Sequence, residues 1–433
     1  MIMRCGKGSV SGSIEAPPSK SSMQRAVACA TLAQGRSILL SGELCADSES
    51  ALRLAESLGA RVRVDGTSVE IEGSPFFVAV SSEEEMPRRD PATGEPIDLD
   101  CGESGLCMRM FSPIASLLPI KTRMIGRGSL LRRPMGMVEK SLQAFGALCA
   151  ASGGFAPLSI KGPLRGGKAT IDAGDSSQLL TGLLIALPLC QGDSELKVEN
   201  AVSKGYLDLT IDTCAAFGVV VERDAEFSRF FIKGRQKYIP ANFHVEGDWS
   251  GAAFLVVAAA IAGGEGGLAI RGLKADSSQP DRAILRAALL AGAAPRFEGD
   301  RLLVGRARLQ AFEFDATDCP DLFPPLVALA SACLGSSAIR GIHRLRGKES
   351  DRAASLKAAF DALGIPVSIE GDRMIVRGGG AEGGVVDACG DHRIAMAAAI
   401  AALGARNPVI IKGSECVSKS WPRFFEDLAS VSR

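Results

Sequence analysis

Glycines that follow amphipathic helix patterns recur at a nearly constant interval along this 433-residue chain. A glycine just past a helix takes a left-handed backbone without steric cost, so each one predicts a helix end. Alternating strand patterns follow most of them, and three of these patterns predict hairpins, around Asp65-Gly66, Gly299-Asp300 and Gly371-Asp372. The recurring glycines, with successive separations of 87, 72, 74 and 72, are Gly59, Gly146, Gly218, Gly292 and Gly364.

A second series alternates with the first. Each member is a short polar cluster that runs directly into an alanine- or leucine-rich apolar segment, which predicts the start of a helix. Its markers are spaced 85, 72, 71, 73 and 71 residues apart, and the longer first step contains the Glu- and Pro-rich stretch Ser81–Pro96, which predicts a surface loop insertion. The markers are Lys20, Gly105, Ser177, Asp248, Asp321 and His392.

The chain therefore consists of six similar units of about 72 residues each. A helix that is apolar on every face must be fully buried, and six such helices cannot share one centre. Two groups of three, each wrapped by sheets and amphipathic helices, is the economical packing. The repeat thus predicts an α/β protein with two domains of three units each.

Composition excludes several functional classes. The 49 basic and 49 acidic residues give a formal charge of zero, which argues against a generally basic nucleic-acid binder. Aromatic residues make up only 5%, too few for a stacking platform for single-stranded nucleic acid. The apolar stretches Leu179–Cys190 and Gly251–Gly264 are too short for a membrane span, and no signal peptide is evident. Cysteines within apolar segments predict a reducing compartment, so we expect a soluble, cytoplasmic protein without a metal site.

The polar clusters also indicate a ligand chemistry. Ser, Asp and Gly at a helix start are ordinary N-cap residues, but capping does not require the cations that stand beside them, such as Lys20, Arg25, Arg109 and Arg393. Helix N-termini carry partial positive charge and free N–H groups, which suit anions. Six such helix starts from two domains predict an interdomain cleft that binds small, multiply anionic molecules.

Seven motifs, in order and together spanning almost the whole chain, resemble those of the 5-enolpyruvylshikimate-3-phosphate synthase family within the enolpyruvyl transferases. They are Ser19-Lys20-Ser21 with Arg25, Ser176-Ser177-Gln178, Ser203-Lys204-Gly205-Tyr206, Val245-Glu246-Gly247-Asp248, Lys348-Glu349-Ser350-Asp351-Arg352, Asp391-His392-Arg393 and Lys419-Ser420-Trp421-Pro422.

The resemblance implies a fold and a reaction. The fold is a two-domain inside-out α/β barrel with buried helices surrounded by sheets. Its first domain is discontinuous, residues 1–17 and 246–433, its second is inserted as residues 18–245, and the active site is the cleft between them. The reaction moves the enolpyruvyl group of phosphoenolpyruvate to the 5-hydroxyl of shikimate 3-phosphate by addition and elimination, in the shikimate pathway of aromatic amino-acid biosynthesis. No cofactor, metal, nucleic acid or membrane is implied, and a monomer is expected.

Residue roles are carried over from the matching motif positions. The resemblance implies that Asp321 acts on the 5-hydroxyl, that Glu349 moves the proton at the methylene carbon, and that Lys20 and His392 complete the catalytic set. Shikimate 3-phosphate is expected to contact Lys20, Ser21, Arg25, Ser176, Ser177, Gln178, Ser203, Tyr206, Asp321, Arg344 and Lys348. Phosphoenolpyruvate is expected to contact Lys20, Gly105, Arg109, Arg133, Gln178, Arg352, Arg393 and Lys419.

The chain departs from the family pattern in a few places. Glu103-Ser104-Gly105-Leu106 stands where many members have Asn-Ala-Gly-Thr, so an acid is expected beside the phosphoenolpyruvate site. Arg344 replaces an asparagine of some members, and Gly205 replaces a frequent proline. These departures leave sensitivity to glyphosate open.

Three alternatives remain. The sister transferase that acts on UDP-N-acetylglucosamine usually has a cysteine five residues before the arginine of an Arg-Pro pair, where this chain has Gly128, and a Lys-Asn pair where it has Lys20-Ser21. A non-catalytic repeat scaffold explains the period but leaves the cations at the helix starts unexplained. A degenerate enzyme that only binds its ligands is the third alternative.

Overall fold

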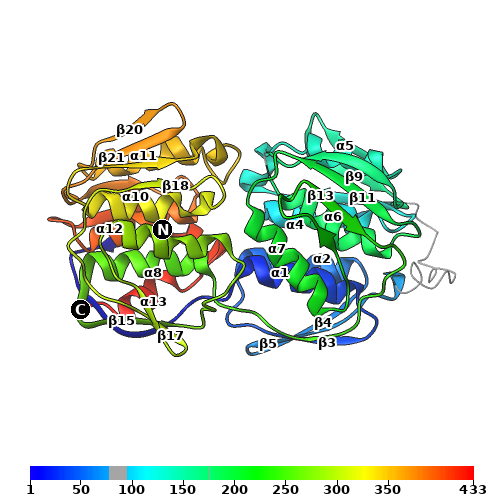
Figure 1. Cartoon of the computed structure of the whole chain (residues 1–433), viewed down its shortest axis with the longest axis horizontal. Coiled ribbons are helices and arrows are strands. Elements are labelled where there is room, and N and C mark those ends of the chain that lie inside the picture. Colours follow the sequence, from blue (N-terminus) through cyan, green and yellow to red (C-terminus); the bar gives the residue numbers. More distant parts are fainter. Residues whose placement is uncertain (78–94, 175) are drawn as a thin grey trace. The chain divides into compact units, whose positions relative to one another are not determined.

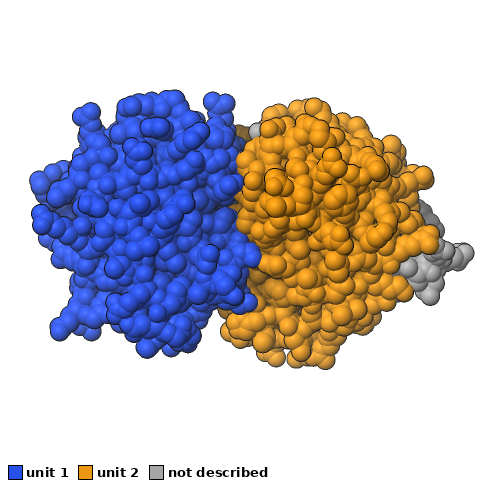
Figure 2. Space-filling view, in the orientation of Figure 1, with its two compact units in different colours: residues 1–19, 246–433 blue, residues 20–245 orange. Residues whose placement is uncertain are grey.

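The computed structural model describes residues 1–77, 95–174 and 176–433. The predicted loop Ser81–Pro96 lies almost entirely outside these residues. The described chain divides into two compact units, which are coloured separately in Figure 2. Unit 1 comprises Met1–Ser19 and Glu246–Arg433, and unit 2 comprises Lys20–Val245. Each unit has a hydrophobic core of its own.

The described residues of unit 2 form three four-stranded sheets, ordered β14-β3-β5-β4, β6-β7-β9-β8 and β10-β11-β13-β12. Its strands are β3 (Arg36–Leu40), β4 (Arg61–Asp65), β5 (Ser68–Glu72), β6 (Ile97–Asp100), β7 (Lys121–Ile125), β8 (Leu148–Ser152), β9 (Phe155–Lys161), β10 (Lys168–Asp172), β11 (Ser194–Glu199), β12 (Glu222–Arg223), β13 (Arg229–Ile232) and β14 (Asn242–His244). Its helices are α1 (Lys20–Leu32), α2 (Ala46–Ser57), α4 (Gly105–Ala115), α5 (Gly136–Ala144), α6 (Gln178–Ala186) and α7 (Lys204–Ala216), with 3-10 turns η1 (Gly128–Arg132) and η2 (Leu187–Leu189).

Unit 1 contains two four-stranded sheets, β16-β17-β15-β2 and β18-β19-β21-β20, and the three-stranded sheet β1-β23-β22. Its strands are β1 (Ile2–Cys5), β2 (Val10–Glu15), β15 (Gly263–Arg271), β16 (Arg296–Glu298), β17 (Arg301–Val304), β18 (Glu313–Asp315), β19 (Ser336–Arg340), β20 (Val367–Glu370), β21 (Arg373–Arg377), β22 (Gly384–Asp387) and β23 (Val409–Lys412). Its helices are α8 (Trp249–Ala262), α9 (Ile284–Leu290), α10 (Phe323–Ala332), α11 (Arg352–Ala362), α12 (His392–Ala402) and α13 (Phe424–Ser430), with 3-10 turns η3 (Pro280–Ala283), η4 (Pro320–Leu322), η5 (Ile342–Leu345) and η6 (Ser414–Lys419).

The sheets share one plan, which confirms the predicted α/β class. Each of the six sheets in the described residues has one parallel pair, for example β6 with β7 or β18 with β19, and the other pairings are antiparallel. The three predicted hairpins are present as β4–β5, β16–β17 and β20–β21. The recurring glycines all have a left-handed backbone, with φ between 79° at Gly364 and 93° at Gly59.

Six apolar helices fill the two cores, as the repeat predicted (Figure 1). They are α1, α4 and α6 in unit 2 and α8, α10 and α12 in unit 1. The polar clusters lie at their starts, and several give true caps: Ser104 accepts from the Cys107 N–H, Asp248 from Ser250, and Asp391 from Arg393. Pro134 lies just before α5, which begins at Gly136, and the Pro134 carbonyl accepts from Arg109.

The two chain crossings between the units lie side by side within unit 1. The Ser19 N–H donates to the Glu246 carbonyl at 2.8 Å, and the Asp248 N–H donates to the Pro17 carbonyl at 2.7 Å. An isolated antiparallel bridge also pairs Pro18 with Gly247. Unit 2 is therefore inserted between two segments of unit 1 that are hydrogen-bonded to each other.

Candidate active site

The starts of the buried helices in unit 2 are joined to one another by polar side chains. Gln24 of α1 donates to Ser104, the N-cap of α4, at 3.3 Å. Arg109 of α4 donates through Nη1 to the side-chain oxygen of Gln178, the first residue of α6, at 2.8 Å. The starts of α1, α4 and α6 are therefore connected through side-chain hydrogen bonds within unit 2.

Two buried arginines converge over the first residue of α4. A Cβ at Gly105 would lie 2.5 Å from Nη1 of Arg133 and 3.5 Å from Nη1 of Arg109, so a larger residue there would require the Arg133 side chain to move. Arg133 and Arg109 are 5% and 6% exposed. Two buried guanidiniums at a helix N-terminus form a strongly cationic surface, suited to a carboxylate or phosphate.

Arg25 has a structural role that its sequence position does not reveal. Its guanidinium donates to Thr210 at 2.9 Å, to Thr181 at 3.3 Å and to the Tyr206 carbonyl at 3.2 Å, and thus ties α1 to α6 and α7. Burial lowers the pKa of Arg25 to about 10, although nearby groups such as Tyr206 oppose the shift. Fully buried donors of this kind are expensive to leave unpaired. Arg25 thus holds together the helices that carry the predicted ligands.

The other predicted residues of unit 2 lie at or near helix starts. Lys20, the first residue of α1, forms an ion pair with Asp47 of α2 at 2.9 Å, with side chains 15% and 9% exposed. Ser21 offers its carbonyl to Arg25. Ser203 is the buried residue before α7, with an unusual φ of 54°, and Tyr206 lies on the first turn of α7. Ser176 accepts from the Gln178 N–H at 3.2 Å, and the buried Ser177 is the N-cap position of α6.

In unit 1, one buried arginine binds three carboxylates. Arg352 has a side chain only 1% exposed. Its Nε lies 2.9 Å from Asp391, its Nη1 lies 2.9 Å from Asp321, and its Nη2 donates to Glu349. These acids hold the pKa of Arg352 above its usual range despite burial. The guanidinium therefore fixes the two predicted proton-transfer groups, Asp321 and Glu349, on one planar fork.

Asp321 is surrounded by cations. Arg393 contacts its carboxylate at 3.2 Å and its carbonyl at 3.3 Å, and Lys348 lies 3.3 Å from the carboxylate. Burial alone would raise the Asp321 pKa, but Arg393, Lys348 and Arg352 together hold that pKa well below its usual range. Burial lowers the pKa of Lys348, and the nearby Asp321 opposes this shift. Asp321 is therefore ionised at neutral pH, with its side chain 22% exposed.

The remaining predicted residues of unit 1 are Lys419, His392 and Arg344. Lys419, at the end of η6, is 3.8 Å from Glu349. His392 begins α12 and is 1% exposed. Arg344 of η5 is buried and donates to the Thr317 carbonyl at 3.3 Å. The predicted residues thus form two sets, one in each unit.

Sequence reasoning missed three acids that complete these sets. Asp391 belongs to the Asp391-His392-Arg393 motif, where its position before a helix indicates only a cap. The sequence around Asp47 gives no sign that this acid pairs with Lys20. Asp281 of η3 accepts from Ser250 of α8. Burial and the neighbouring Asp321 raise its pKa to about 7. The signal for each acid is tertiary, because its partner lies 27 to 39 positions away.

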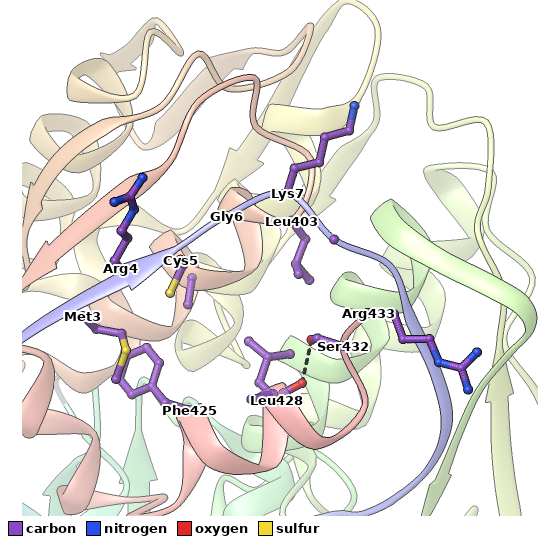
Figure 3. Close-up of a pocket in the computed structure, with 13 residues that line it drawn as sticks. Met3, Arg4, Cys5, Gly6, Lys7, Leu403, Phe425, Leu428, Ser432 and Arg433 are labelled. Atoms are coloured by element: carbon purple, nitrogen blue, oxygen red, sulfur yellow. Dashed lines mark hydrogen bonds between the residues drawn. The ribbon is translucent and has the colours of Figure 1, made fainter.

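The cavity drawn in Figure 3 lies away from these residues. It has a volume of about 360 Å³ and is lined by β1, the end of α12 and α13, with Cys5, Leu403, Phe425 and Leu428 among its walls. None of the predicted site residues lines it. Among the described residues, no group of His, Cys, Asp and Glu could hold a metal ion, and no helix is long and apolar enough to cross a membrane.

Comparison with solved structures first defines the class of protein, a two-domain α/β fold. Two structures of EPSP synthase from Acinetobacter baumannii superpose with TM-scores of 0.79. One is 24% identical and covers 99% of this chain and 97% of its own, and the other is 23% identical and covers 100% and 98%.

The family follows from the sequence itself. The sequence model of the family EPSP synthase (3-phosphoshikimate 1-carboxyvinyltransferase) matches residues 5–428 of this chain. Curated 3-phosphoshikimate 1-carboxyvinyltransferases from Aeropyrum pernix and Clostridium kluyveri are 36% and 33% identical, over 98% and 97% of this chain and 93% and 95% of their own lengths. The chain belongs to the EPSP synthase family, a family of enzymes.

Proposed function

We propose that this chain transfers the enolpyruvyl group of phosphoenolpyruvate to the 5-hydroxyl of shikimate 3-phosphate, which gives 5-enolpyruvylshikimate 3-phosphate and phosphate. Its family membership over residues 5–428 supports this reaction. In the addition step, the 5-hydroxyl oxygen bonds to C2 of phosphoenolpyruvate, the hydroxyl proton leaves, and a proton adds to C3. In the elimination step, the tetrahedral intermediate loses phosphate from C2 and a proton from C3.

One observation carries the mechanism: the guanidinium of Arg352 binds the carboxylates of both Asp321 and Glu349. Addition and elimination require one group near the 5-hydroxyl and another near C3, held at a fixed separation. In the proposal, Asp321 accepts the hydroxyl proton, and Glu349 delivers and later removes the proton at C3. The planar guanidinium of Arg352 fixes the distance between the two carboxylates.

The low pKa of Asp321 bears on this role, because a strongly stabilised carboxylate is a weak base. An oxyanion of phosphoenolpyruvate that binds Arg393 and Arg352 would share the charge that now stabilises Asp321. We expect the Asp321 pKa to rise as a result, so substrate binding itself would prepare the base. The same cations would stabilise the negative charge that develops on oxygen in the transition state.

The binding roles of the two residue sets are part of this proposal. Phosphoenolpyruvate is assigned to Lys20, Gly105, Arg109, Arg133, Gln178, Arg352, Arg393 and Lys419. Shikimate 3-phosphate is assigned to Lys20, Ser21, Arg25, Ser176, Ser177, Gln178, Ser203, Tyr206, Asp321, Arg344 and Lys348, with His392 near the transferred phosphate. Arg109 contacts Gln178 within unit 2, and Arg352 contacts Asp321 within unit 1. Action of both units on the same two substrates is part of the proposal. The cytoplasmic location and the monomeric state of this enzyme remain predictions.

The decisive experiment measures phosphate release from phosphoenolpyruvate with each of two acceptors. We expect release with shikimate 3-phosphate and none with UDP-N-acetylglucosamine. Release with the nucleotide sugar alone would assign the chain to the sister reaction. No release with either acceptor, together with calorimetric binding of shikimate 3-phosphate, would indicate a binding protein that has lost catalysis.

A further inference from the structure

Glu103, the acid that departs from the family pattern, is engaged by the turn that precedes Arg133. Its carboxylate accepts from the Ser129 backbone N–H at 3.1 Å and from the Ser129 hydroxyl at 3.3 Å. Ser129 lies in the first turn of η1, where the first N–H groups of a helix lack intrahelical acceptors. A carboxylate is well suited to that position, because the N–H dipoles there favour negative charge.

The contact is sterically close as well as polar. Gly128 has a φ of +58°, and a Cβ built there would lie 2.4 Å from the carboxyl group of Glu103. A side chain at position 128 would therefore be strained by its backbone and would displace the Glu103 carboxylate. The absence of a side chain at Gly128 therefore leaves room for the Glu103 carboxylate.

The same turn leads directly to a predicted phosphoenolpyruvate ligand. Arg133 follows the last residue of η1, and its N–H donates to the Leu130 carbonyl at 3.1 Å. Its guanidinium lies against Gly105, two residues after Glu103. Glu103 thus holds the beginning of the segment whose end places Arg133 at the start of α4.

Backbone hydrogen bonds on both sides of the turn limit how far loss of the Glu103 carboxylate can disturb the structure. The Cys101 N–H donates to Ile125 at 2.9 Å, and the Arg127 N–H donates to Gly102 at 2.8 Å. These backbone bonds extend the β6–β7 pair up to the turn and do not involve the Glu103 side chain. Loss of the carboxylate should therefore loosen η1 without unfolding unit 2.

We propose that Glu103 is a positioning residue for phosphoenolpyruvate binding, which acts by anchoring the Gly128–Arg132 turn and thereby fixing Arg133. The inference rests on the proposed function. It also accounts for an acid so near a site for an anion, because the carboxylate is bound by N–H and O–H donors of the turn.

The test compares Glu103→Ala, which removes the acceptor, with Glu103→Gln, which keeps an acceptor oxygen and removes the charge. Asp224→Ala is the matched control, because Asp224 accepts from the Ser228 N–H at 2.8 Å and the Ser228 hydroxyl at 2.5 Å on a connection that carries no predicted site residue. We expect Glu103→Ala to raise the KM for phosphoenolpyruvate about three- to tenfold. The KM for shikimate 3-phosphate and kcat should stay within about twofold, Glu103→Gln should lie closer to wild type, and the control should change nothing.

Other outcomes would overturn the proposal. An unchanged KM for phosphoenolpyruvate in Glu103→Ala would show that the contact with Ser129 does not affect substrate binding. An equal rise of this KM in Glu103→Ala and Glu103→Gln would show that the acceptor oxygen does not account for the effect. A lower KM in both shows that Glu103 acts as a repelling charge. If kcat and both KM values change together, the effect is general disorder instead of positioning.

Hydrogen exchange of residues 126–133 separates failure of this inference from failure of the proposed function. Faster exchange in Glu103→Ala, but not in Asp224→Ala, is expected whatever the substrate. If wild-type protein releases no phosphate, the proposed reaction is wrong, and exchange alone decides whether Glu103 anchors the turn. Should Glu103→Ala fail to fold, Ser129→Ala removes one of the two donors and should give a smaller change of the same kind.

Discussion

The carboxylate of Asp391 binds the guanidinium of Arg352 along one edge, 2.9 Å from Nε and 3.3 Å from Nη2. The same carboxylate caps α12 by accepting from the Arg393 N–H at 3.0 Å. One acid thus sets the position of two arginines that are assigned to phosphoenolpyruvate, one by a side-chain contact and one through the helix that carries it.

Substitution of Asp391 by asparagine tests this double role. The amide can still cap α12, but it leaves Arg352 with one carboxylate fewer in a buried environment, which should cost about 3 kcal/mol of stability. Chemical denaturation of the free protein measures this. Asp351→Asn is the control. The Asp351 side chain caps α11 by accepting from the Ala354 N–H at 3.2 Å, and the contacts described for the Arg352 guanidinium do not include it. Equal losses in both variants would show that capping alone matters.

Arg25→Lys should destabilise the free protein. Lysine cannot reach Thr210, Thr181 and the Tyr206 carbonyl together, so buried acceptors lose their donor, at a cost of about 2–4 kcal/mol. The exposed Arg36, paired with Glu70 on neighbouring strands, gives the control Arg36→Lys, expected to change stability by under about 0.5 kcal/mol. A normal melting temperature with weakened shikimate 3-phosphate binding would instead make Arg25 chiefly a ligand.

Glu349→Gln should lower kcat by about 10²- to 10⁴-fold, because the amide cannot exchange a proton with C3 of phosphoenolpyruvate. Steady-state phosphate release measures the loss, and calorimetry should still detect shikimate 3-phosphate binding. Glu370→Gln changes an exposed glutamate on β20 that accepts from Ser368, and should leave turnover unaltered. Full activity in Glu349→Gln would exclude the acid-base role.

Asp281 should make stability depend on pH in an unusual direction. Burial and the nearby Asp321 raise its folded-state pKa to about 7, above the value of about 3.9 expected in the unfolded chain. Between these values the folded protein holds a proton that the unfolded chain has lost, so this group's contribution is full below about pH 4 and declines as pH rises to about 7.

The measurement is the unfolding free energy of wild type and Asp281→Asn at several pH values. The asparagine stays neutral, so the variant should gain stability relative to wild type from pH 4 to pH 7. Asp300→Asn, in the turn between β16 and β17, provides a control whose difference from wild type should not follow this trend. A difference for Asp281→Asn that is independent of pH would show that this carboxyl group does not titrate in that range.

The elements of the fold were predictable because their signals are local. The glycines after α2, α5, α7, α9 and α11 have the left-handed backbone that their spacing indicated, and the polar clusters lie at the starts of the buried helices. Repetition made each weak signal stronger, because the same pattern returned at a fixed interval.

Pairing between distant side chains was not predictable in the same way. Lys20, Arg352 and Arg25 were identified as cations near helix starts, but nothing in the sequence indicates that Asp47 and Asp391 pair with the first two or that threonines of α6 and α7 surround the third. Such contacts depend on how helices pack, and residue types alone leave many partners open. Glu103 is a further case, since the sequence placed an acid beside the phosphoenolpyruvate site but did not indicate its contacts with Ser129.

The insertion of unit 2 between hydrogen-bonded segments of unit 1 has a consequence for biosynthesis. Strands β1 and β2 are made first, yet β1 pairs with β23 and β2 pairs with β15, both of which follow residue 262. Unit 2 has all of its strands once β14 has been made, so it can fold on the ribosome while the first strands still lack their partners. Strands β1 and β2 can therefore complete their native pairing only after β23 and β15 have been made.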